Sequence, residues 1–264
     1  MTHIKVAGKL NEKRRAEGEN YKPVKWSLAT FETLPEDMDH MEDRFYGFLF
    51  QDSDFAKWIE AVGYSLTQHP DPELEKIADE AIDIVCAAQL ENGYLDTYYI
   101  INGMDAALTN LRDHHELYCL GHLIEGAIAY FEATGKDKLL RAAARFADFI
   151  EERFGPEEGK CKGYPGHEIA EMALVRLYEV TGEDKYLRLS KFFVDQRGQK
   201  PFYFQVEDKA RAEKEGRPWK GDINQGSDYH QGSDCHRGSG CHRVPLCRDF
   251  GYPDFHYPAS YYCK

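Results

Sequence analysis

The sequence predicts an all-α fold made of packed helical hairpins. Between residues 52 and about 195, apolar residues recur at helical spacing, and strand-like alternation does not extend beyond a few residues. A hairpin turn nearly repeats itself at residues 133–140 and 180–187. Repeated helix pairs form a solenoid or a closed toroid, because one pair cannot bury its own apolar face. Roughly three pairs are visible, so we expect an incomplete (α/α)6 toroid, about half of the barrel.

The first two helices are bounded by strong breaking signals. Phe55, Ile59 and Val62 share one side of the first helix, which starts near Ser53. That helix stops before Pro70, since the residue preceding a proline is pushed away from helical angles. A second helix is expected over residues 72–90, where an Asn-Gly turn ends it.

Four more helices follow. The third, over residues 113–134, is predicted to open with a capping box, in which Asp113 accepts from the amide three residues on and Glu116 reaches back. The same apolar spacing predicts further helices over residues 136–154, 166–180 and 185–196.

The chain divides near residue 224. Residues 1–224 are interpreted as the partial α/α barrel, with residues 1–51 as an extended or short-helical lead-in. From residue 225 to residue 264 the composition changes to Gly, Ser, His and Cys in a six-residue near-repeat, followed by Pro- and Tyr-rich sequence. We expect no helix there, only an irregular tail.

Composition argues against several classes of protein. The chain has 46 acidic and 33 basic side chains and a net charge of -13, and no basic cluster stands out, so nucleic acid is not an expected partner. No run approaches roughly 18 apolar residues and the start lacks an apolar signal core, so no membrane association is expected. The odd count of 7 cysteines favours reduced thiols. We therefore expect a cytoplasmic protein.

Five sequence phrases, taken in their order along the chain, are more informative than any one of them alone. They are FQDSD (50–54), KWIEA (57–61), QLENGYLDTYY (89–99), HELYCLGHLIEGA (115–127) and GYPGHE (163–168). As a set they resemble glycoside hydrolase family 127, whose known members are β-L-arabinofuranosidases built on an (α/α)6 barrel. The resemblance extends from the first residues to about Asn224. It implies a retaining glycosidase that acts on arabinofuranoside-containing carbohydrates.

The resemblance also implies zinc chemistry whose residues this sequence lacks. In that family a zinc-bound cysteine is the nucleophile and a glutamate is the general acid/base, in a downstream Glu-x-Cys segment and a Cys-Cys pair. This sequence contains neither pattern. We therefore expect no catalytic residue and no bound zinc in this chain, which would be a truncated and inactive portion with part of a sugar pocket.

Three residues are candidates for binding the sugar. By motif, His115 and His167 match two family histidines that hydrogen-bond arabinofuranose, and Gln51 matches a third polar contact. Both histidines are placed at or just inside the N-terminal end of a helix, where the dipole disfavours imidazolium. A neutral ring has one donor and one acceptor, which suits sugar hydroxyls. The structural alternative is a histidine that caps its own helix or rests in the core.

Other constellations remain open. His115, Cys119 and His122 fall on one helix face, as metal ligands could, but the preferred interpretation is the inner face of a barrel helix. The candidates for aromatic stacking surfaces at a sugar pocket are Tyr94, Tyr98, Tyr99, Tyr164 and Trp58. Glu125 and Glu168 are an alternative pair for two-carboxylate glycosidase chemistry.

The tail offers a zinc alternative of its own. Cys235, Cys241 and Cys247 recur at a strict spacing and, with His236, supply four ligands of the kind zinc prefers. The spacing lacks the short turn between cysteines that structural zinc sites use. The preferred interpretation is a shift of reading frame near Asn224, which would replace an amphipathic helix with an arbitrary string.

Three functional hypotheses follow. The first is a truncated family 127 hydrolase, and the second is a non-catalytic carbohydrate-binding or interaction module. The third is another α/α-toroid sugar enzyme, such as an unsaturated glucuronyl hydrolase or an epimerase. Turnover of an arabinofuranoside would exclude the second. An incomplete barrel exposes apolar helix faces, so self-association is expected.

Overall fold

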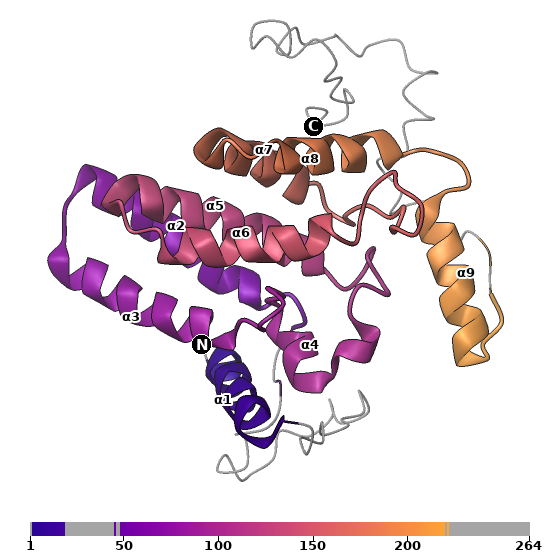
Figure 1. Ribbon diagram of the computed structural model, residues 1–264, viewed down its shortest axis with the longest axis horizontal. Coiled ribbons are helices and arrows are strands. Elements are labelled where there is room, and N and C mark those ends of the chain that lie inside the picture. The colour runs from indigo at the N-terminus through magenta and orange to yellow at the C-terminus, as the bar shows by residue number, and fades with distance from the viewer. Residues whose placement is uncertain (1, 19–44, 46–47, 220, 222–264) are drawn as a thin grey trace, which may run out of the picture.

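The predicted all-α fold is confirmed. The structure is a computed structural model that describes residues 2–18, 45, 48–219 and 221 (Figure 1). These residues contain helices and one isolated β-bridge, without a β-strand. The helices are α1 (Thr2–Glu17), α2 (Asp52–Gln68), α3 (Pro72–Ala88), α4 (Thr97–Asn102), the 3-10 turn η4 (Met104–Ala106), α5 (Glu116–Thr134), α6 (Lys138–Glu151), α7 (Ala170–Thr181), α8 (Asp184–Gln196) and α9 (Tyr203–Glu215).

Three hairpins of the described chain, α2–α3, α5–α6 and α7–α8, stack in two layers. α5 packs against both α2 and α7, and α6 packs against α3 and α8. We call α2, α5 and α7 the first layer and α3, α6 and α8 the second layer. The hairpin turns all lie at the left of Figure 1. Because each hairpin reverses the chain, the helices of the first layer run in the same direction and begin at the same edge.

Glycines allow α2 and α5 to approach each other closely. A Cβ atom on Gly126 would stand 2.5 Å from the carbonyl oxygen of Ala56, and one on Gly63 would stand 2.6 Å from the backbone of Ala129. Contacts this short do not occur between real Cβ atoms and backbone, so any larger residue would push the two helices apart. The two glycines therefore fix the spacing of the first layer.

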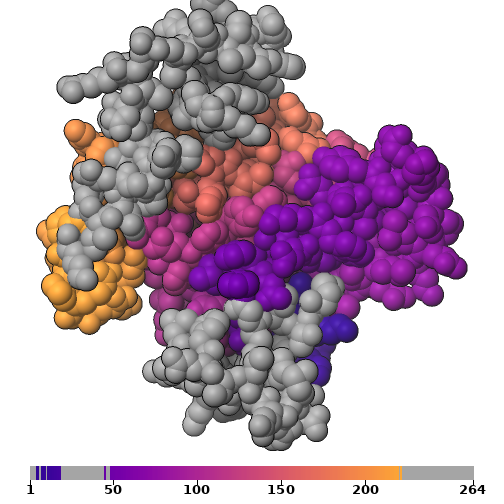
Figure 2. Space-filling view, turned by 180° about the vertical axis from the view of Figure 1, so that it is seen from behind, coloured from indigo at the N-terminus to yellow at the C-terminus, as the bar shows by residue number. Residues whose placement is uncertain are grey.

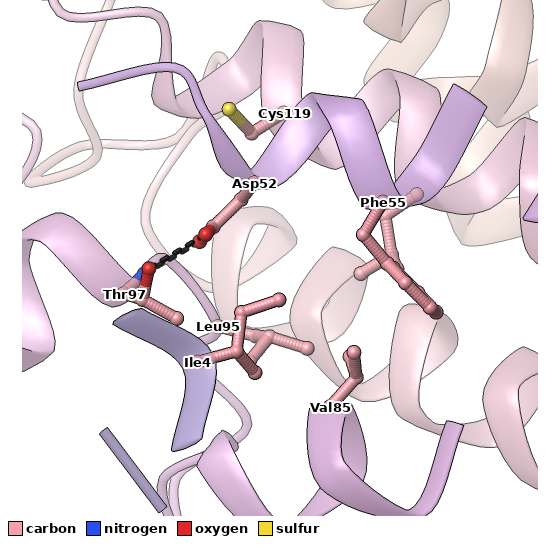
Figure 3. Close-up of a pocket in the computed structure, with 8 residues that line it drawn as sticks. Ile4, Asp52, Phe55, Val85, Leu95, Thr97 and Cys119 are labelled. Carbon is pink, nitrogen blue, oxygen red and sulfur yellow. Dashed lines mark hydrogen bonds between the residues drawn. The ribbon is translucent and has the colours of Figure 1, made fainter. Parts of the chain in front are cut away.

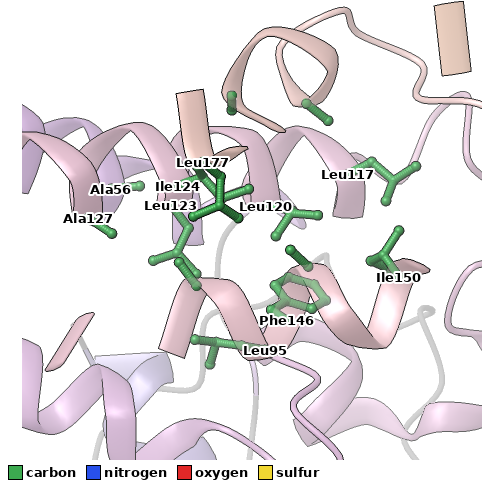
Figure 4. Packing of buried hydrophobic residues seen from close by; sticks show 14 of the residues in the cluster. Ala56, Leu95, Leu117, Leu120, Leu123, Ile124, Ala127, Phe146, Ile150 and Leu177 are labelled. Carbon is green, nitrogen blue, oxygen red and sulfur yellow. The ribbon is translucent and has the colours of Figure 1, made fainter. Parts of the chain in front are cut away.

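The hydrophobic core lies between the layers. Leu117, Leu120 and Ile124 of α5 face the side chains of α6, among them Phe146 and Ile150 (Figure 4). All five are almost completely removed from solvent. Burying a side chain of this size stabilises the fold by about 1.5–3 kcal/mol. The core thus holds the first layer in place and leaves the opposite face of α5 to other contacts.

The start of the chain is more helical than the sequence predicted. α1 spans 16 residues, and Ile4, Ala7 and Asn11 face inward from it. Asn11 donates from Nδ2 to the carbonyl oxygen of Ala88 at 2.7 Å, and Arg14 donates to the backbone of α4. Most of the α1 sequence is polar, so its apolar period is weak. Tertiary hydrogen bonds hold this helix where the pattern gives little signal.

The predicted capping box of α5 is wrong. The N-cap of α5 is His115, in the left-handed conformation, and no side chain caps the helix. Asp113 instead accepts from Arg112, at 3.0 Å from Nε. Glu116 points inward and accepts from the amide of Leu108 at 2.8 Å. Leaving the buried amide of Leu108 without a hydrogen-bond partner would cost more free energy than leaving the helix end to solvent. The Glu116 carboxylate therefore bonds to that amide instead of capping α5.

The other helices match the predictions within a few residues, except that α7 begins at Ala170 rather than at residue 166. α4 and α9 were not predicted, because α4 has only 6 residues and α9 is mostly polar. The tail at residues 225–264, with its alternative zinc ligands, lies outside the described residues. No described helix combines the length and the apolar character that crossing a bilayer requires.

Candidate functional site

The first layer ends in one edge, here called the rim, which consists of the N-terminal ends of α2, α5 and α7. Gln51 precedes α2, His115 is the N-cap of α5, and His167 lies in the segment that enters α7. The ring of His115 is 5.1 Å from that of Phe50 and 4.7 Å from that of His167, between centroids. The structure therefore brings together the two histidines that the sequence singled out.

A directional hydrogen-bond chain joins the two imidazoles. Nδ1 of His115 lies against the carbonyl oxygen of Asp113, which can only accept, so this nitrogen carries a proton. The Nε2 atoms of His115 and His167 are 2.9 Å apart. In a neutral His115 ring Nε2 is the acceptor, and His167 must then donate from its Nε2. For a neutral His115, the arrangement thus defines one tautomer for each ring.

The backbone holds the two histidine segments against each other. His115 has a φ of 60°, in the left-handed region where His is enriched among residues other than glycine. A Cβ atom on Gly166 would collide with the carbonyl oxygen of Arg112. Since only glycine permits this approach, the segment that enters α7 lies directly on the segment that enters α5. His167 is placed beside His115 by that contact.

Tyr118 lies one helical turn after His115 and packs against both histidines. Its ring centroid is 5.7 Å from that of His115 and 5.4 Å from that of His167. It is also 4.4 Å from that of His122, in an edge-on arrangement. Lys57 of α2 donates from Nζ to the Tyr118 hydroxyl at 2.7 Å. Sequence analysis did not single out the exposed Lys57 or the half-buried Tyr118, although both lie within the quoted phrases.

His122 is kept neutral by its surroundings. Burial, with a smaller contribution from the charge of Lys57, lowers the pKa of His122 to about 4. Its Nδ1 is buried and has no hydrogen-bond partner. Cys119 faces α2 instead, with its thiol 3.7 Å from the carbonyl oxygen of Phe50. Among the described residues no group of three or more His, Cys, Asp or Glu side chains is placed to hold a metal ion, and the structure does not bring His115, Cys119 and His122 together as such a group.

Gln51 occupies the same rim, on the α2 side. Its backbone amide donates to the carbonyl oxygen of Phe48 at 3.0 Å, within the turn that starts α2. Its side-chain Oε1 is buried and has no hydrogen-bond partner. A buried amide oxygen without a partner costs about 1–3 kcal/mol, which makes Gln51 a candidate for accepting a hydrogen bond from a ligand.

The tyrosines proposed as stacking surfaces lie in the core instead. Those almost completely removed from solvent are Tyr94, Tyr98, Tyr99 and Tyr164. Tyr94 donates to the carboxylate of Glu116 at 2.6 Å. Burial raises the pKa of Glu116 to about 7, although this hydrogen bond opposes the shift. Trp58 remains partly exposed on α2. The four tyrosines therefore pack in the core rather than line the rim.

A small cavity lies behind the start of α2 (Figure 3). It has a volume of about 20 Å³ and is lined by Ile4, Asp52, Phe55, Val85, Leu95, Thr97, Cys119 and Leu123. The Asp52 carboxylate spans its edge and accepts from both the amide and the hydroxyl of Thr97, each at 2.6 Å. That volume suits about one water molecule and not a sugar ring. The rim, rather than this cavity, is the candidate binding site.

Both carboxylates proposed as a two-carboxylate pair are held by arginines. Glu125 pairs with Arg176 of α7, and Glu168 lies 3.2 Å from Arg197. Arg197 also holds Glu171 at 2.9 Å. Burial raises the pKa of Glu125, and the guanidinium of Arg176 opposes that shift. These pairs join α5 to α7 and α7 to the end of α8, so the geometry favours a structural role for Glu125 and Glu168.

The fold and the rim together define an α/α-toroid protein with two paired histidines at the rim. The family model described as "Beta-L-arabinofuranosidase, GH127 catalytic domain" matches residues 8–233. The chain therefore belongs to glycoside hydrolase family 127. This bears out the family resemblance of the five phrases.

Relatives with known names agree with this family. The chain is 45% identical over 174 residues to a non-reducing end β-L-arabinofuranosidase of Bifidobacterium longum subsp. longum, covering 64% of this chain and 26% of that protein. A crystal structure of a GH127 β-L-arabinofuranosidase from Geobacillus stearothermophilus T6 is similar with a TM-score of 0.67 and 45% identity, over 86% of this chain and 32% of the other. A second GH127 β-arabinofuranosidase is similar with a TM-score of 0.57 and 35% identity, over 75% and 31%. The chain thus spans about a third or less of the length of these relatives.

Proposed function

We propose that the rim is the part of a glycoside hydrolase site that binds a β-L-arabinofuranose unit, with His115, His167 and Gln51 as its hydrogen-bonding residues. The observation that carries the proposal is the His115–His167 pair, whose Nε2 atoms are 2.9 Å apart at the rim. The names of the relatives support the substrate class, since they are β-L-arabinofuranosidases.

The tautomers of the pair match a sugar hydroxyl. One hydroxyl can accept from Nε2–H of His167 and donate to Nε2 of His115, so it can replace the direct contact between the rings. Neither ring nitrogen then loses a partner when the sugar enters. Gln51 adds an acceptor, because its Oε1 is buried without a partner. Polar groups that converge on one hydroxyl-rich ligand give orientation as well as affinity.

Catalytic groups are assigned outside this site. The proposal gives no bond-breaking role to the described residues, which also lack a cluster suited to zinc. In the intact family a zinc-bound cysteine would act as the nucleophile, and its ligands would have to come from other residues. The chain as given is proposed to bind the sugar without turning it over.

The test is a titration of the 264-residue chain with methyl β-L-arabinofuranoside, in which binding is monitored by NMR. Binding should shift the imidazole signals of His115 and His167. Replacing either histidine by alanine should weaken binding about three- to tenfold, the value of one hydrogen bond between neutral groups. The matched control is Lys76→Gln, on the exposed surface of α3, which should leave the affinity unchanged.

Two outcomes would count against the proposal. One is equal affinity for the wild type and for both histidine variants. The other is release of arabinose from p-nitrophenyl β-L-arabinofuranoside by the chain, because that would require catalytic residues within it. Epimerisation of a sugar without hydrolysis would instead favour a different α/α-toroid enzyme.

Further features of the chain are proposed on separate grounds. The described cysteines, Cys86, Cys119 and Cys161, are unpaired, which supports a reducing compartment such as the cytoplasm. Trp58 of α2 and Met172 of α7 are partly exposed at 37% and 45%, which supports self-association through the first layer. A shifted reading frame near Asn224 remains our proposal for the tail, and sequencing the encoding DNA there would test it.

A further inference from the structure

Tyr118 is the residue that the two rim histidines share. Its ring lies against His115 from the same helix and against His167 from the segment that enters α7. The hydrogen bond between the rings and the close approach of Gly166 to Arg112 also join those two segments. The orientation of Tyr118 therefore influences both imidazoles at once.

Lys57 fixes that orientation from the neighbouring helix. Its Nζ donates to the Tyr118 hydroxyl at 2.7 Å and to the Ser53 hydroxyl at 3.2 Å, and it lies 5.0 Å from the centre of the Tyr118 ring. α2 lies open on the face shown in violet in Figure 2. A lysine at an exposed helix position ordinarily stays mobile in solvent, because ordering it costs side-chain entropy.

Lys57 has no acidic partner among the described residues, although the chain carries 46 acidic side chains. Its two hydrogen bonds go to neutral hydroxyls. Hydrogen bonds from a charged donor are worth about 1.5–3 kcal/mol, more than those between neutral groups. The charge of Lys57 is therefore directed at Tyr118 and Ser53 rather than cancelled by a carboxylate, which sets it apart from the ion-paired Lys136 and Lys138.

We propose that Lys57 is a positioning residue that acts through Tyr118 to hold His115 and His167 in the geometry that binds the sugar. This inference rests on the proposed function of the rim. Lys57 does not touch the sugar in this arrangement, and Tyr118 transmits its effect by ring contact. Without the contact between Lys57 and Tyr118, the Tyr118 ring is free to turn, and the two imidazoles lose their common support.

The test uses imidazole nitrogen shifts, which report the tautomer of each histidine without any sugar present. In the wild type, His115 should carry its proton on Nδ1 and His167 on Nε2. Lys57→Gln and Tyr118→Phe should each convert this single state into a mixture of tautomers. Each should also weaken binding of methyl β-L-arabinofuranoside about three- to tenfold.

Two further variants separate positioning from general damage. The double variant Lys57→Gln/Tyr118→Phe should lose no more than either single variant, because both break one contact. Lys57→Arg keeps the charged donor and should restore both the tautomers and the affinity. Lys76→Gln and Tyr186→Phe, on the second layer, are controls that should change neither. Tyr118→Phe retains the aromatic ring, so it remains informative if Lys57→Gln does not fold.

The readouts distinguish this inference from the proposed function. If the wild type binds no arabinofuranoside, the proposed function fails, and the tautomers still decide whether Lys57 and Tyr118 hold the histidines. If the wild type binds the sugar, but the Lys57 and Tyr118 variants keep wild-type tautomers and affinity, the positioning role is wrong. Additive losses in the double variant would also overturn it.

Discussion

The two faces of α5 differ in how deeply their side chains are buried and in what those side chains contact. One face carries Leu117, Leu120 and Ile124, which are almost completely buried against the second layer. The other carries His115 and Tyr118, which are only partly buried and contact α2 and the segment that enters α7. Both sets recur at the same helical spacing. Periodicity thus locates the two faces, and the chemistry of the side chains distinguishes the face that packs in the core from the face that carries the proposed sugar site.

The comparison predicts that the same truncation has unequal costs on the two faces. Ile124→Ala should lower the free energy of unfolding by about 2–5 kcal/mol, because it leaves a cavity in the core. His122→Ala should lower it by about 1 kcal/mol or less, since the removed ring is partly exposed and its Nδ1 makes no hydrogen bond. Denaturant unfolding measures both. Equal losses would contradict the assignment of the two faces.

Glu116 links the faces and should make stability depend on pH. Burial raises the pKa of Glu116 to about 7 in the folded chain, above the value of 4.5 expected when it is exposed. Between these two values the folded state binds more protons than the unfolded state, so the free energy of unfolding should fall as pH rises from about 4.5 to 7.

Glu116→Gln tests this dependence, since the amide cannot ionise. Glu207 has a pKa raised to about 7 by burial as well, and it contributes a slope of the same sign in both proteins. The melting temperature of the wild type should therefore fall more steeply with pH than that of the variant. Parallel curves would show that Glu116 titrates normally.

The close approach of α2 and α5 gives the next effect in size. Gly126→Ala places a Cβ atom 2.5 Å from the carbonyl oxygen of Ala56, so it should destabilise the fold by about 1–3 kcal/mol. Gly8→Ala is the matched control in α1, where the nearest atom to the new Cβ is 3.6 Å away. That variant should be neutral or slightly stabilising, because alanine favours helix. Calorimetric melting distinguishes the two.

The smallest effect is expected at the cap of α3, in the second layer. Asp71 accepts from the amides of Glu73 and Leu74 at 3.0 and 3.1 Å. Asp71→Ala should lower the free energy of unfolding by about 1 kcal/mol, and Asp71→Asn, which keeps an acceptor, by less. Urea unfolding is precise enough to separate them. If Asp71→Asn were as damaging as Asp71→Ala, charge rather than capping would explain the effect.

The hairpin layers could be predicted from the sequence because their apolar residues keep a helical period. α1 and α4 could not, since α1 is held by tertiary hydrogen bonds such as that of Asn11, and α4 is a single short segment. The capping box at Asp113 failed for a related reason. Which acceptor a buried amide uses depends on the folded surroundings, and in this fold the amide of Leu108 donates to the Glu116 carboxylate.

For the site, sequence motifs identified His115 and His167, and the structure brings them together. The tyrosines were misplaced, because an aromatic residue after a turn has the same pattern whether it lines a pocket or fills the core. Tyr118 and Lys57 were missed, since their contact joins residues 61 positions apart. Only the packing of α2 on α5 reveals it.

The central claim is that the rim binds the sugar between its two histidines. A crystal structure of the chain with methyl β-L-arabinofuranoside tests it most directly. We expect a sugar hydroxyl between the Nε2 atoms of His115 and His167, within hydrogen-bonding distance of both. A sugar bound elsewhere, for example on exposed Trp58, with the two imidazoles still bonded to each other, would contradict the account.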